Sequence, residues 1–467
     1  MTARTKLVAV GQTISLEITG LNHSGEGVGR YEGLAVFVPG TVPGEAVLAR
    51  VEDLKKNYAR AGLLEVTDKS DLRREPLCAH YAACGGCRLQ HIDYARQLRL
   101  KTTRVRDSLA RIAGLDHVPV LDTAGMEQPW HYRNKVHYQL KSGSDGLELG
   151  FYREGSHTLA PLFGPPNLKV PGCLLAHRDL NDLAQVVEKI LNRHGLAQSR
   201  LDGGRFFRHL MLRKGFATGE TMAVLVTGEA EWPGEKGFVA ELNSLRPGLT
   251  SLVRNINPGP PGQVLGRENR LLAGREQITD RLGHLNFIIS PTSFYQVNPA
   301  QTLTLYRKAL DYAGLEELDS PVVLDAYSGI GAIALFMAGR AGKVHGLEEV
   351  AGAVEDARRN AALNGIKNID FHHGRVEELL PEMASRGLKP DVVVLDPPRS
   401  GCRPGVLEAV ARMKTPRVVY ISCDPGTLAR DLGLLASLGY RTEEVQPVDM
   451  FPWTHHTETA CLLIRTR

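Results

Sequence analysis

Residues 324–334 read Leu-Asp-Ala-Tyr-Ser-Gly-Ile-Gly-Ala-Ile-Ala, and this stretch decides the fold. It begins where the apolar run Val322–Leu324 ends, and such runs are typical of buried parallel strands. Asp325 then precedes a glycine turn that opens a helical segment. Glycines in such a turn allow a ligand to approach the backbone closely. The stretch therefore predicts the first strand and the ligand-binding turn of an α/β sheet.

Further short apolar strands follow in the last third of the chain. The runs Val392–Leu395 and Val418–Ile421 are apolar throughout, and amphipathic helices separate them. Alternation of buried strands with helices is typical of a doubly wound parallel sheet, in which ligands bind at the carboxyl ends of the strands. We therefore expect residues 290–467 to form one α/β domain whose active site lies at the strand ends.

The strand after the glycine turn indicates which ligand the turn binds. Residues Lys343–Glu348 end in a carboxylate about 20 residues after the turn, where it can accept hydrogen bonds from a ribose. A dinucleotide site ordinarily has a third glycine, and Ala334 stands at that position here. Because no diphosphate has to be accommodated, the pattern favours adenosylmethionine over a nicotinamide cofactor.

Two later strand ends carry side chains suited to chemistry. Asp396 precedes two prolines, which fix a rigid turn beside the ligand. Cys423 ends an apolar strand directly before a Pro-Gly turn, where a thiol can act as a nucleophile rather than a packing residue. The helix start that follows Cys423 is expected to lower the pKa of its thiol. Together these residues predict nucleophilic catalysis beside a methyl donor.

A candidate base lies near the end of the chain. Glu458 directly precedes the final apolar strand, so its carboxylate could take a proton from carbon. His455 and His456 are rival bases, and a surface role for all three side chains is the remaining alternative.

The rest of the chain predicts two further domains, because 467 residues exceed what one core usually organises. Residues 5–67 show short alternating strands broken by glycine and proline, which indicates a small closed β-barrel. Residues 70–285 mix strands with a helix near 179–194. Basic residues alternate with aromatic ones at 55–60 and 130–135, and this combination suits RNA.

Composition sets broad limits on function. Hydrophobic content of 43% and charged content of 23% are typical of a soluble globular protein, and no segment reads as a membrane span. The first residues lack an apolar signal core, so we expect a cytoplasmic protein. A net charge of +4 permits a polyanionic partner without demanding one. Nothing indicates an obligate protein partner.

Seven cysteines are too few for a disulfide scaffold, so a reducing compartment would leave them as thiols, ligands or nucleophiles. Cys78, Cys84 and Cys87 lie close together, and Cys173 follows far downstream. Four thiolates are enough for a [4Fe-4S] cluster or a tetrahedral zinc site. Zinc sites more often consist of two paired Cys-x2-Cys halves, so the spacing favours iron-sulfur without excluding zinc.

Three signatures together resemble the RNA 5-methyluridine methyltransferases, specifically the iron-sulfur branch that acts on 23S ribosomal RNA. They are Ser422–Pro425 with the following Thr427–Asp431, the run Asp449–Pro452 leading to Glu458, and Phe294–Asn298. The resemblance extends from the N-terminal barrel, which is similar to a TRAM RNA-binding domain, to the last strand.

This resemblance implies a class I adenosylmethionine-dependent methyltransferase fold, a Rossmann-like doubly wound α/β sheet, with an N-terminal OB-like β-barrel and a central α+β domain. It implies methylation of C5 of a uridine, with Cys423 as nucleophile and Glu458 as base. The residues that it assigns to adenosylmethionine are Gln296, Tyr327, Glu348 and Asp396. Those that it assigns to the [4Fe-4S] cluster are Cys78, Cys84, Cys87 and Cys173.

Other functions compete with this interpretation. The same reaction on a T-loop uridine of transfer RNA would use the same residues. A non-catalytic RNA-binding iron-sulfur protein would have no use for Cys423 and Glu458. An amino methyltransferase would centre on the turn 396–398 and leave Cys423 idle. RNA 5-methylcytosine enzymes carry a second cysteine in the proline turn, and this chain has none there.

Overall fold

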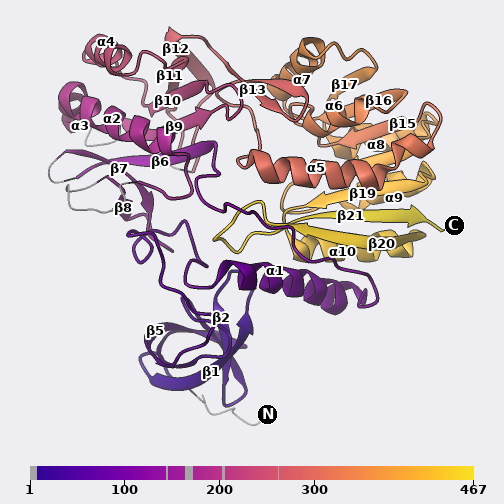
Figure 1. Cartoon of the computed structure of the whole chain (residues 1–467), viewed down its shortest axis with the longest axis horizontal. Coiled ribbons are helices and arrows are strands. Elements are labelled where there is room, and N and C mark those ends of the chain that lie inside the picture. Colours follow the sequence, from indigo (N-terminus) through magenta and orange to yellow (C-terminus); the bar gives the residue numbers. More distant parts are fainter. Residues whose placement is uncertain (1–7, 144–145, 164–171, 202–205, 261, 467) are drawn as a thin grey trace.

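The computed structural model describes residues 8–143, 146–163, 172–201, 206–260 and 262–466. The expected residues 5–7 of the barrel lie outside this range. Figure 1 shows three units, a barrel, a central sheet with helices on one face, and a second sheet with helices on both faces.

The N-terminal unit is a closed five-stranded barrel with the strand order β1-β2-β3-β5-β4. Alternating residues of its strands face inward, as Ile14, Leu16 and Ile18 do on the first strand, where each is at most 5% exposed. The strands are β1 (Thr13–Leu21), β2 (Gly27–Tyr31), β3 (Leu34–Val38), β4 (Ala46–Leu54) and β5 (Tyr58–Asp68).

Helix α1 (Tyr94–Ser108) links the barrel to the rest of the chain and continues into a π-helical turn, η1 (Leu109–Ala113). Asp93 caps its first turn by accepting a hydrogen bond from the backbone N–H of Arg96, and Gly114 ends the helix in the left-handed conformation, at φ = 66°. Figure 1 shows α1 between the barrel and the C-terminal sheet. Its buried side chains Val105 and Leu109 belong to the core of that sheet.

The central unit is a seven-stranded sheet with the order β12-β11-β10-β9-β6-β7-β8. One face is covered by its helices, and the other contributes Met211, Met222 and Val224 to the core of the C-terminal unit. The strands are β6 (Lys135–Ser142), β7 (Leu147–Tyr152), β8 (Leu159–Pro161), β9 (Phe207–Lys214), β10 (Thr221–Thr227), β11 (Ser251–Ile256) and β12 (Glu268–Gly274). The helices are α2 (Arg178–His194), α3 (Leu196–Leu201) and α4 (Glu235–Leu245).

A hairpin of β13 (Ile278–Leu282) and β14 (Leu285–Ile289) leads into the C-terminal unit, a second seven-stranded sheet of order β17-β16-β15-β18-β19-β21-β20. Its first five strands run parallel, whereas β21 is antiparallel to both neighbours. The strands are β15 (Val322–Ala326), β16 (Lys343–Glu348), β17 (Ile369–His373), β18 (Val392–Leu395), β19 (Arg417–Ser422), β20 (Tyr440–Val448) and β21 (Glu458–Arg465).

Helices cover both faces of this sheet. Side chains of α5, α6 and α7 share one core, and those of α8, α9 and α10 share another. The helices are α5 (Pro299–Ala313), η2 (Leu315–Glu317), α6 (Ala332–Ala338), α7 (Ala351–Leu363), α8 (Val376–Ser385), α9 (Pro404–Arg412) and α10 (Pro425–Ser437). The doubly wound sheet, the barrel and the α+β unit predicted from the sequence are thereby confirmed.

The strand order reverses between β15 and β18, because the chain first adds β16 and β17 on one side and then returns to the other. Such a reversal opens a crevice at the carboxyl ends of the strands, where ligands of α/β proteins bind. No helix in the described ranges is both long and apolar enough to cross a membrane.

Candidate active site

Strand register brings Asp396, Cys423 and Glu458 to one edge of the C-terminal sheet. Leu395 pairs with Tyr420 across β18 and β19, and Asp396 follows Leu395. Ser422 pairs with Thr459 across β19 and β21, so Cys423 adjoins Ser422 while Glu458 adjoins Thr459. Three neighbouring strands therefore place two carboxyl groups and a thiol at the carboxyl ends of the sheet, where the active site was expected.

The environment of Cys423 raises the pKa of its thiol to about 12. Burial is the main cause, and the negative charges of Glu458 and Asp396 add to it, while Arg399 opposes them. The expectation that the following helix lowers this pKa is therefore wrong for the free chain. Asp424 supplies a physical reason, since its carboxylate accepts the N–H groups of Gly426 and Thr427 at 2.9 Å and so occupies the start of α10.

Both carboxyl groups of the cluster also hold their protons more tightly than usual. Burial raises the pKa of Asp396 to about 7. Burial and the charge of Asp396 raise the pKa of Glu458 to about 8, against the opposing charge of Arg399. Carboxyl groups whose pKa lies near neutrality are suited to general acid-base catalysis.

Arg399 and His456 form the exposed rim of the cluster. A guanidinium nitrogen of Arg399 lies 3.1 Å from Nδ1 of His456 and 3.3 Å from its Nε2. Burial and the positive charge of Arg399 lower the pKa of His456 to about 4, so this ring is neutral at neutral pH. Sequence reasoning assigned no role to Arg399, although it directly follows the Asp-Pro-Pro turn.

A narrow cavity lies at the crevice between β15 and β18, beside the glycine turn. Of the residues assigned to adenosylmethionine, Gln296, Tyr327 and Asp396 line it. Glu348 does not line it, and its carboxylate instead accepts the N–H groups of Gly329, at 3.0 Å, and Val350, at 2.8 Å. Through Gly329, which lines the cavity, Glu348 holds the glycine turn in place.

The glycine turn has left-handed backbone at Tyr327, Gly329 and Gly331. Tyr327 has φ = 67°, which is uncommon for a residue with a side chain. Gly331 has φ = 81°, and a Cβ added there would lie 2.7 Å from the ring of Phe371. The turn therefore needs glycine at 331 for both conformation and space.

Two polar residues that sequence reasoning did not assign face this turn without partners. Asp325 is fully buried, and neither oxygen of its carboxyl group has a hydrogen-bond partner. Burial, together with the nearby Asp396, holds the pKa of Asp325 well above its ordinary value. The hydroxyl of Ser328, in the wall of the cavity, is also unpaired. Unpaired buried groups are costly, and a polar ligand would satisfy them.

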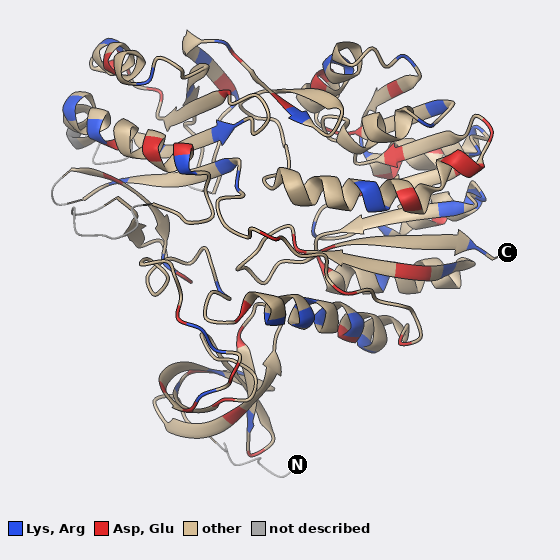
Figure 2. Cartoon of the chain, viewed as in Figure 1, with Lys and Arg blue, Asp and Glu red and all other residues tan. Residues whose placement is uncertain are grey.

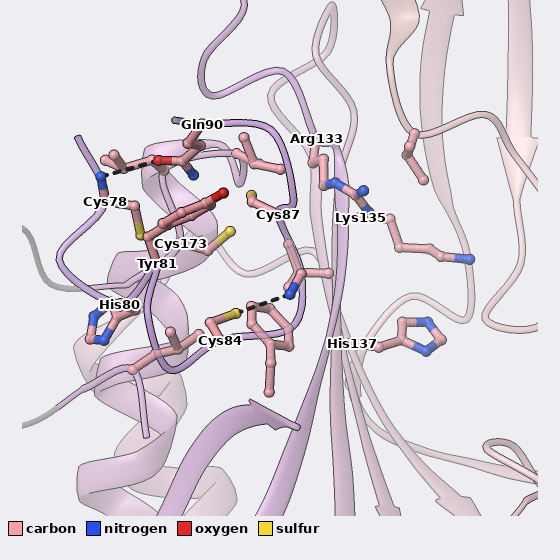
Figure 3. Close-up of a pocket in the computed structure, with 17 residues that line it drawn as sticks. Cys78, His80, Tyr81, Cys84, Cys87, Gln90, Arg133, Lys135, His137 and Cys173 are labelled. Carbon is pink, nitrogen blue, oxygen red and sulfur yellow. Dashed lines mark hydrogen bonds between the residues drawn. The ribbon is translucent and has the colours of Figure 1, made fainter. Parts of the chain in front are cut away.

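The four cysteines assigned to a cluster gather around one cavity of about 410 Å³. Cys78, Cys84 and Cys87 come from the loop before α1, whereas Cys173 comes from the segment before α2. Figure 3 shows their thiols facing one another, with Arg133, Lys135 and His137 on the opposite wall. Of the other three cysteines, Cys402 and Cys461 are buried in the core, whereas Cys423 is partly buried.

The thiols around this cavity do not converge on a single point. In the part of the chain that the structure describes, no three His, Cys, Asp or Glu side chains are arranged to hold one metal ion. A zinc ion would need its sulfur ligands about 2.3 Å from a common centre. A cluster of several iron atoms is larger than one ion, so its thiolates are bound further apart.

The fold and the crevice define a class I adenosylmethionine-dependent methyltransferase. A solved tRNA (uracil-54, C5)-methyltransferase from Pyrococcus abyssi, in complex with S-adenosyl-L-homocysteine, matches 97% of this chain and 100% of its own. Its TM-score is 0.75 and its sequence identity is 27%. Residues 265–466 match the family tRNA (Uracil-5-)-methyltransferase, and residues 7–64 match the TRAM domain.

Full-length relatives are more similar still. An uncharacterized RNA methyltransferase of Caldanaerobacter subterraneus is 42% identical over 461 residues, which cover 98% of this chain and 99% of that protein. One from Bacillus cereus is 41% identical over 465 residues, with 99% of each chain covered. The chain therefore belongs to the RNA (uracil-5-)-methyltransferase family, and it is an adenosylmethionine-dependent enzyme with an RNA substrate.

Proposed function

We propose that this enzyme methylates C5 of a uridine in 23S ribosomal RNA through a transient covalent bond between Cys423 and C6 of the base. The observation that carries the proposal is the convergence of Cys423, Asp396 and Glu458 on one sheet edge, next to the glycine-turn cavity. A thiol in this position has a role in attack on carbon and none in simple RNA binding.

The proposed reaction follows from the poor nucleophilicity of uracil C5. The Cys423 thiolate attacks C6, an S–C6 bond forms, and the electron pair of the C5–C6 double bond moves into an enolate. Adenosylmethionine supplies an electrophilic methyl group, which C5 attacks as the methyl-sulfur bond breaks. Glu458 then takes the C5 proton, the double bond re-forms, and the C6–S bond breaks to release the enzyme.

Protonation of the cluster supports this division of roles. The negative charges of Asp396 and Glu458 raise the pKa of Cys423, so a proton on Asp396 favours the thiolate. Arg399 favours it as well, by its positive charge. Glu458, with its pKa near 8, can accept a proton near neutral pH. The three groups thus suit thiolate formation first and proton removal later.

The cofactor would be held by Gln296, Tyr327 and Asp396 in the walls of the cavity, with Glu348 acting through Gly329. The unpaired hydroxyl of Ser328 in the cavity wall fits a ligand with ammonium or hydroxyl donors. At about 50 Å³ the cavity is narrower than adenosylmethionine. Binding therefore requires lining side chains to move, and Phe294, which is 65% exposed, is the least constrained of them.

Trapping with RNA that contains 5-fluorouridine tests the covalent step. Fluorine at C5 cannot leave as a cation, so the enzyme and the methylated base remain joined. We expect a stable protein-RNA band whose crosslinked peptide contains Cys423. Cys423→Ser should give no band while retaining its thermal stability and its binding of adenosylhomocysteine. Undiminished methyl transfer by that variant would refute the proposal.

The identity of the RNA is tested separately. The P. abyssi neighbour and the matched family carry names that specify transfer RNA, which makes the T-loop uridine of transfer RNA the second candidate. Mass mapping of 5-methyluridine in both RNAs from cells lacking this protein distinguishes them. We expect a missing methyl group in 23S RNA, and a loss confined to transfer RNA would select the alternative.

We also propose that Cys78, Cys84, Cys87 and Cys173 hold a [4Fe-4S] cluster. Their position around one cavity, on segments far apart in the sequence, suits a structural crosslink between the loop before α1 and the central unit. Protein purified without oxygen should contain iron and sulfide and absorb visible light. Cys87→Ser should lose both with a fall in thermal stability, whereas Cys423→Ser should keep them. Equal iron content in the two variants would contradict this assignment.

A further inference from the structure

A groove of about 610 Å³ lies between the barrel, helix α1 and the loop that leads to Glu458. The turn between β1 and β2 forms one wall and α1 forms the other. His455, from the loop between β20 and β21, also lines the groove. We refer to this space as the α1 groove.

The α1 groove is rich in positive charge. Arg30 from the barrel, Arg104 from α1 and Arg111 from η1 line it. Asp107 is the single acidic side chain among the described residues of its lining, and it pairs with Arg111 at 3.1 Å. Figure 2 shows lysines and arginines along α1, which lies next to the barrel. An anionic ligand would therefore be attracted to the groove.

Arg104 is a partly buried cation in the groove wall. Its guanidinium donates to the carbonyl oxygen of His455 at 2.5 Å, yet no carboxylate in the described ranges lies within 4.0 Å of it. Burial lowers the pKa of Arg104, and Asp424 opposes this effect only from a longer distance. A partly buried cation without an anion is unfavourable, so a bound anion would stabilise this site.

The α1 groove is structurally connected to the active site. Arg104 holds the backbone of His455, which precedes His456 on the rim of the catalytic cluster and lies three residues before Glu458. The barrel also approaches the same loop, because a Cβ added at Gly25 would lie 3.2 Å from the Cβ of His455. A polymer that enters the active site would therefore find the groove next to it.

Apolar side chains line the groove between the charges. Leu89 and Leu100 are part of its wall, and Ile112, which is 55% exposed, lies at its rim. Single-stranded nucleic acids combine spaced phosphates with flat apolar bases, and grooves that bind them pair cations with apolar surface. A free inorganic anion would have no use for the apolar part.

We propose that the α1 groove binds the sugar-phosphate backbone of single-stranded RNA beside the target uridine, with one phosphate on Arg104. This inference rests on the proposed function and adds the path of the substrate. Through the bond from Arg104 to His455, RNA in the groove would also fix the loop that carries the catalytic base.

The test is binding of a short fluorescein-labelled single-stranded RNA, followed by anisotropy over a series of salt concentrations. Arg30→Gln and Arg111→Gln change exposed side chains, so both variants should fold normally. Each should weaken binding roughly two- to tenfold and reduce the slope of log affinity against log salt by about 0.7, as expected for one lost phosphate contact. Arg104→Gln should do the same and also slow methyl transfer at saturating RNA.

Arg386→Gln is the matched control. Arg386 is 75% exposed and pairs with Glu382 four residues before it on α8, just as Arg111, 79% exposed, pairs with Asp107 on α1. An unchanged salt slope in the double variant Arg30→Gln/Arg111→Gln, or an equal loss in Arg386→Gln, would overturn the inference. If the wild-type enzyme methylates RNA while the double variant binds it normally, the groove assignment alone fails. If the wild type does not methylate RNA, the proposed function fails.

Discussion

The ammonium group of Lys101 on α1 lies 2.5 Å from the carboxylate of Asp449, which follows β20 directly. Both side chains are buried, at 3% and 0% exposure. Asp449 also accepts a hydrogen bond from the hydroxyl of Tyr94, at 2.8 Å, and the ammonium donates to the carbonyl of Phe451. Two residues 348 positions apart thus join α1 to the start of the catalytic loop.

Lys101→Met should strongly destabilise the enzyme, because it leaves the buried charge of Asp449 without a counterion. Removal of one partner of a buried pair typically costs about 3–5 kcal/mol. We expect a clear fall in the temperature of unfolding, measured by calorimetry. The double variant Lys101→Met/Asp449→Asn removes both charges and should recover part of the loss. A double variant no more stable than Lys101→Met would show that the charge is not the cause.

Glu458→Gln should stop the reaction after methyl transfer. Without a base for the C5 proton, the C6–S bond cannot break, so methylated RNA should accumulate on Cys423. Ordinary uridine RNA should then give a covalent band in a denaturing gel, which the wild type gives only with 5-fluorouridine. Glu443→Gln changes a half-buried carboxylate of β20 that pairs with Arg441, so this control variant should turn over normally. If Glu458→Gln releases product normally, then Glu458 is not the base, and His455 or His456 would be the next candidate.

The rate should depend on pH through the carboxyl group of Glu458. Its pKa is raised to about 8, and only the deprotonated form can accept the C5 proton. Release of methylated RNA, the step that needs this base, should therefore become about tenfold faster per unit between about pH 6 and about pH 8. Single-turnover measurements with a fixed RNA concentration test this rise. A flat profile in that range would mean that proton removal is not limited by this group.

Asp396→Asn should stabilise the free enzyme at neutral pH while impairing catalysis. The folded state holds the Asp396 proton up to a pKa of about 7, whereas the unfolded chain releases it near its ordinary value. Unfolding therefore releases a proton between these values, and this group's contribution to stability falls as pH rises from about 4 to about 7. The variant lacks this loss, which at neutral pH amounts to at most about 4 kcal/mol for a pKa raised by about three units.

Unfolding temperatures of both proteins across that pH range measure the effect. The advantage of Asp396→Asn over the wild type should grow with pH. Asp319→Asn, a change at an exposed aspartate, should show no such trend. If the difference in unfolding temperature between Asp396→Asn and the wild type is the same at every pH, a pKa shift at Asp396 is not the cause of that difference.

Much of the C-terminal sheet could be predicted from the sequence because its strands are short and apolar, and glycine or proline residues mark their ends. Lys343–Glu348 and Val392–Leu395 were predicted with the bounds that the structure has. Parallel strands direct their carboxyl ends to one edge, so Asp396 and Cys423 could be placed together from local patterns alone. The barrel was predicted for the same reason, from alternation within single strands.

What depends on distant parts of the chain could not be predicted. The pKa of Cys423 is raised mainly by burial and further by the carboxylates of Glu458 and Asp396, which come from other segments, so the local pattern predicted the wrong direction. The contact of Arg104 with His455 spans 351 positions, and no periodicity in either segment indicates it. Glu348 was expected to contact the cofactor, but its hydrogen bond to Gly329 only emerges from the arrangement of β15 and β16.

Trp453 shows how far the catalytic loop relies on the N-terminal half of the protein. Its carbonyl oxygen accepts the N–H groups of Arg88 and Leu89, both at 3.1 Å, and its indole stacks on Trp130 at 4.2 Å. The backbone at Trp453 is left-handed, at φ = 68°, so neighbouring contacts must hold it there. The N-terminal half and the C-terminal unit therefore cannot be exchanged independently when the enzyme is engineered for another RNA. Grafting a foreign RNA-reading module, or excising the transferase portion for separate use, would remove the scaffold that shapes the base-bearing loop.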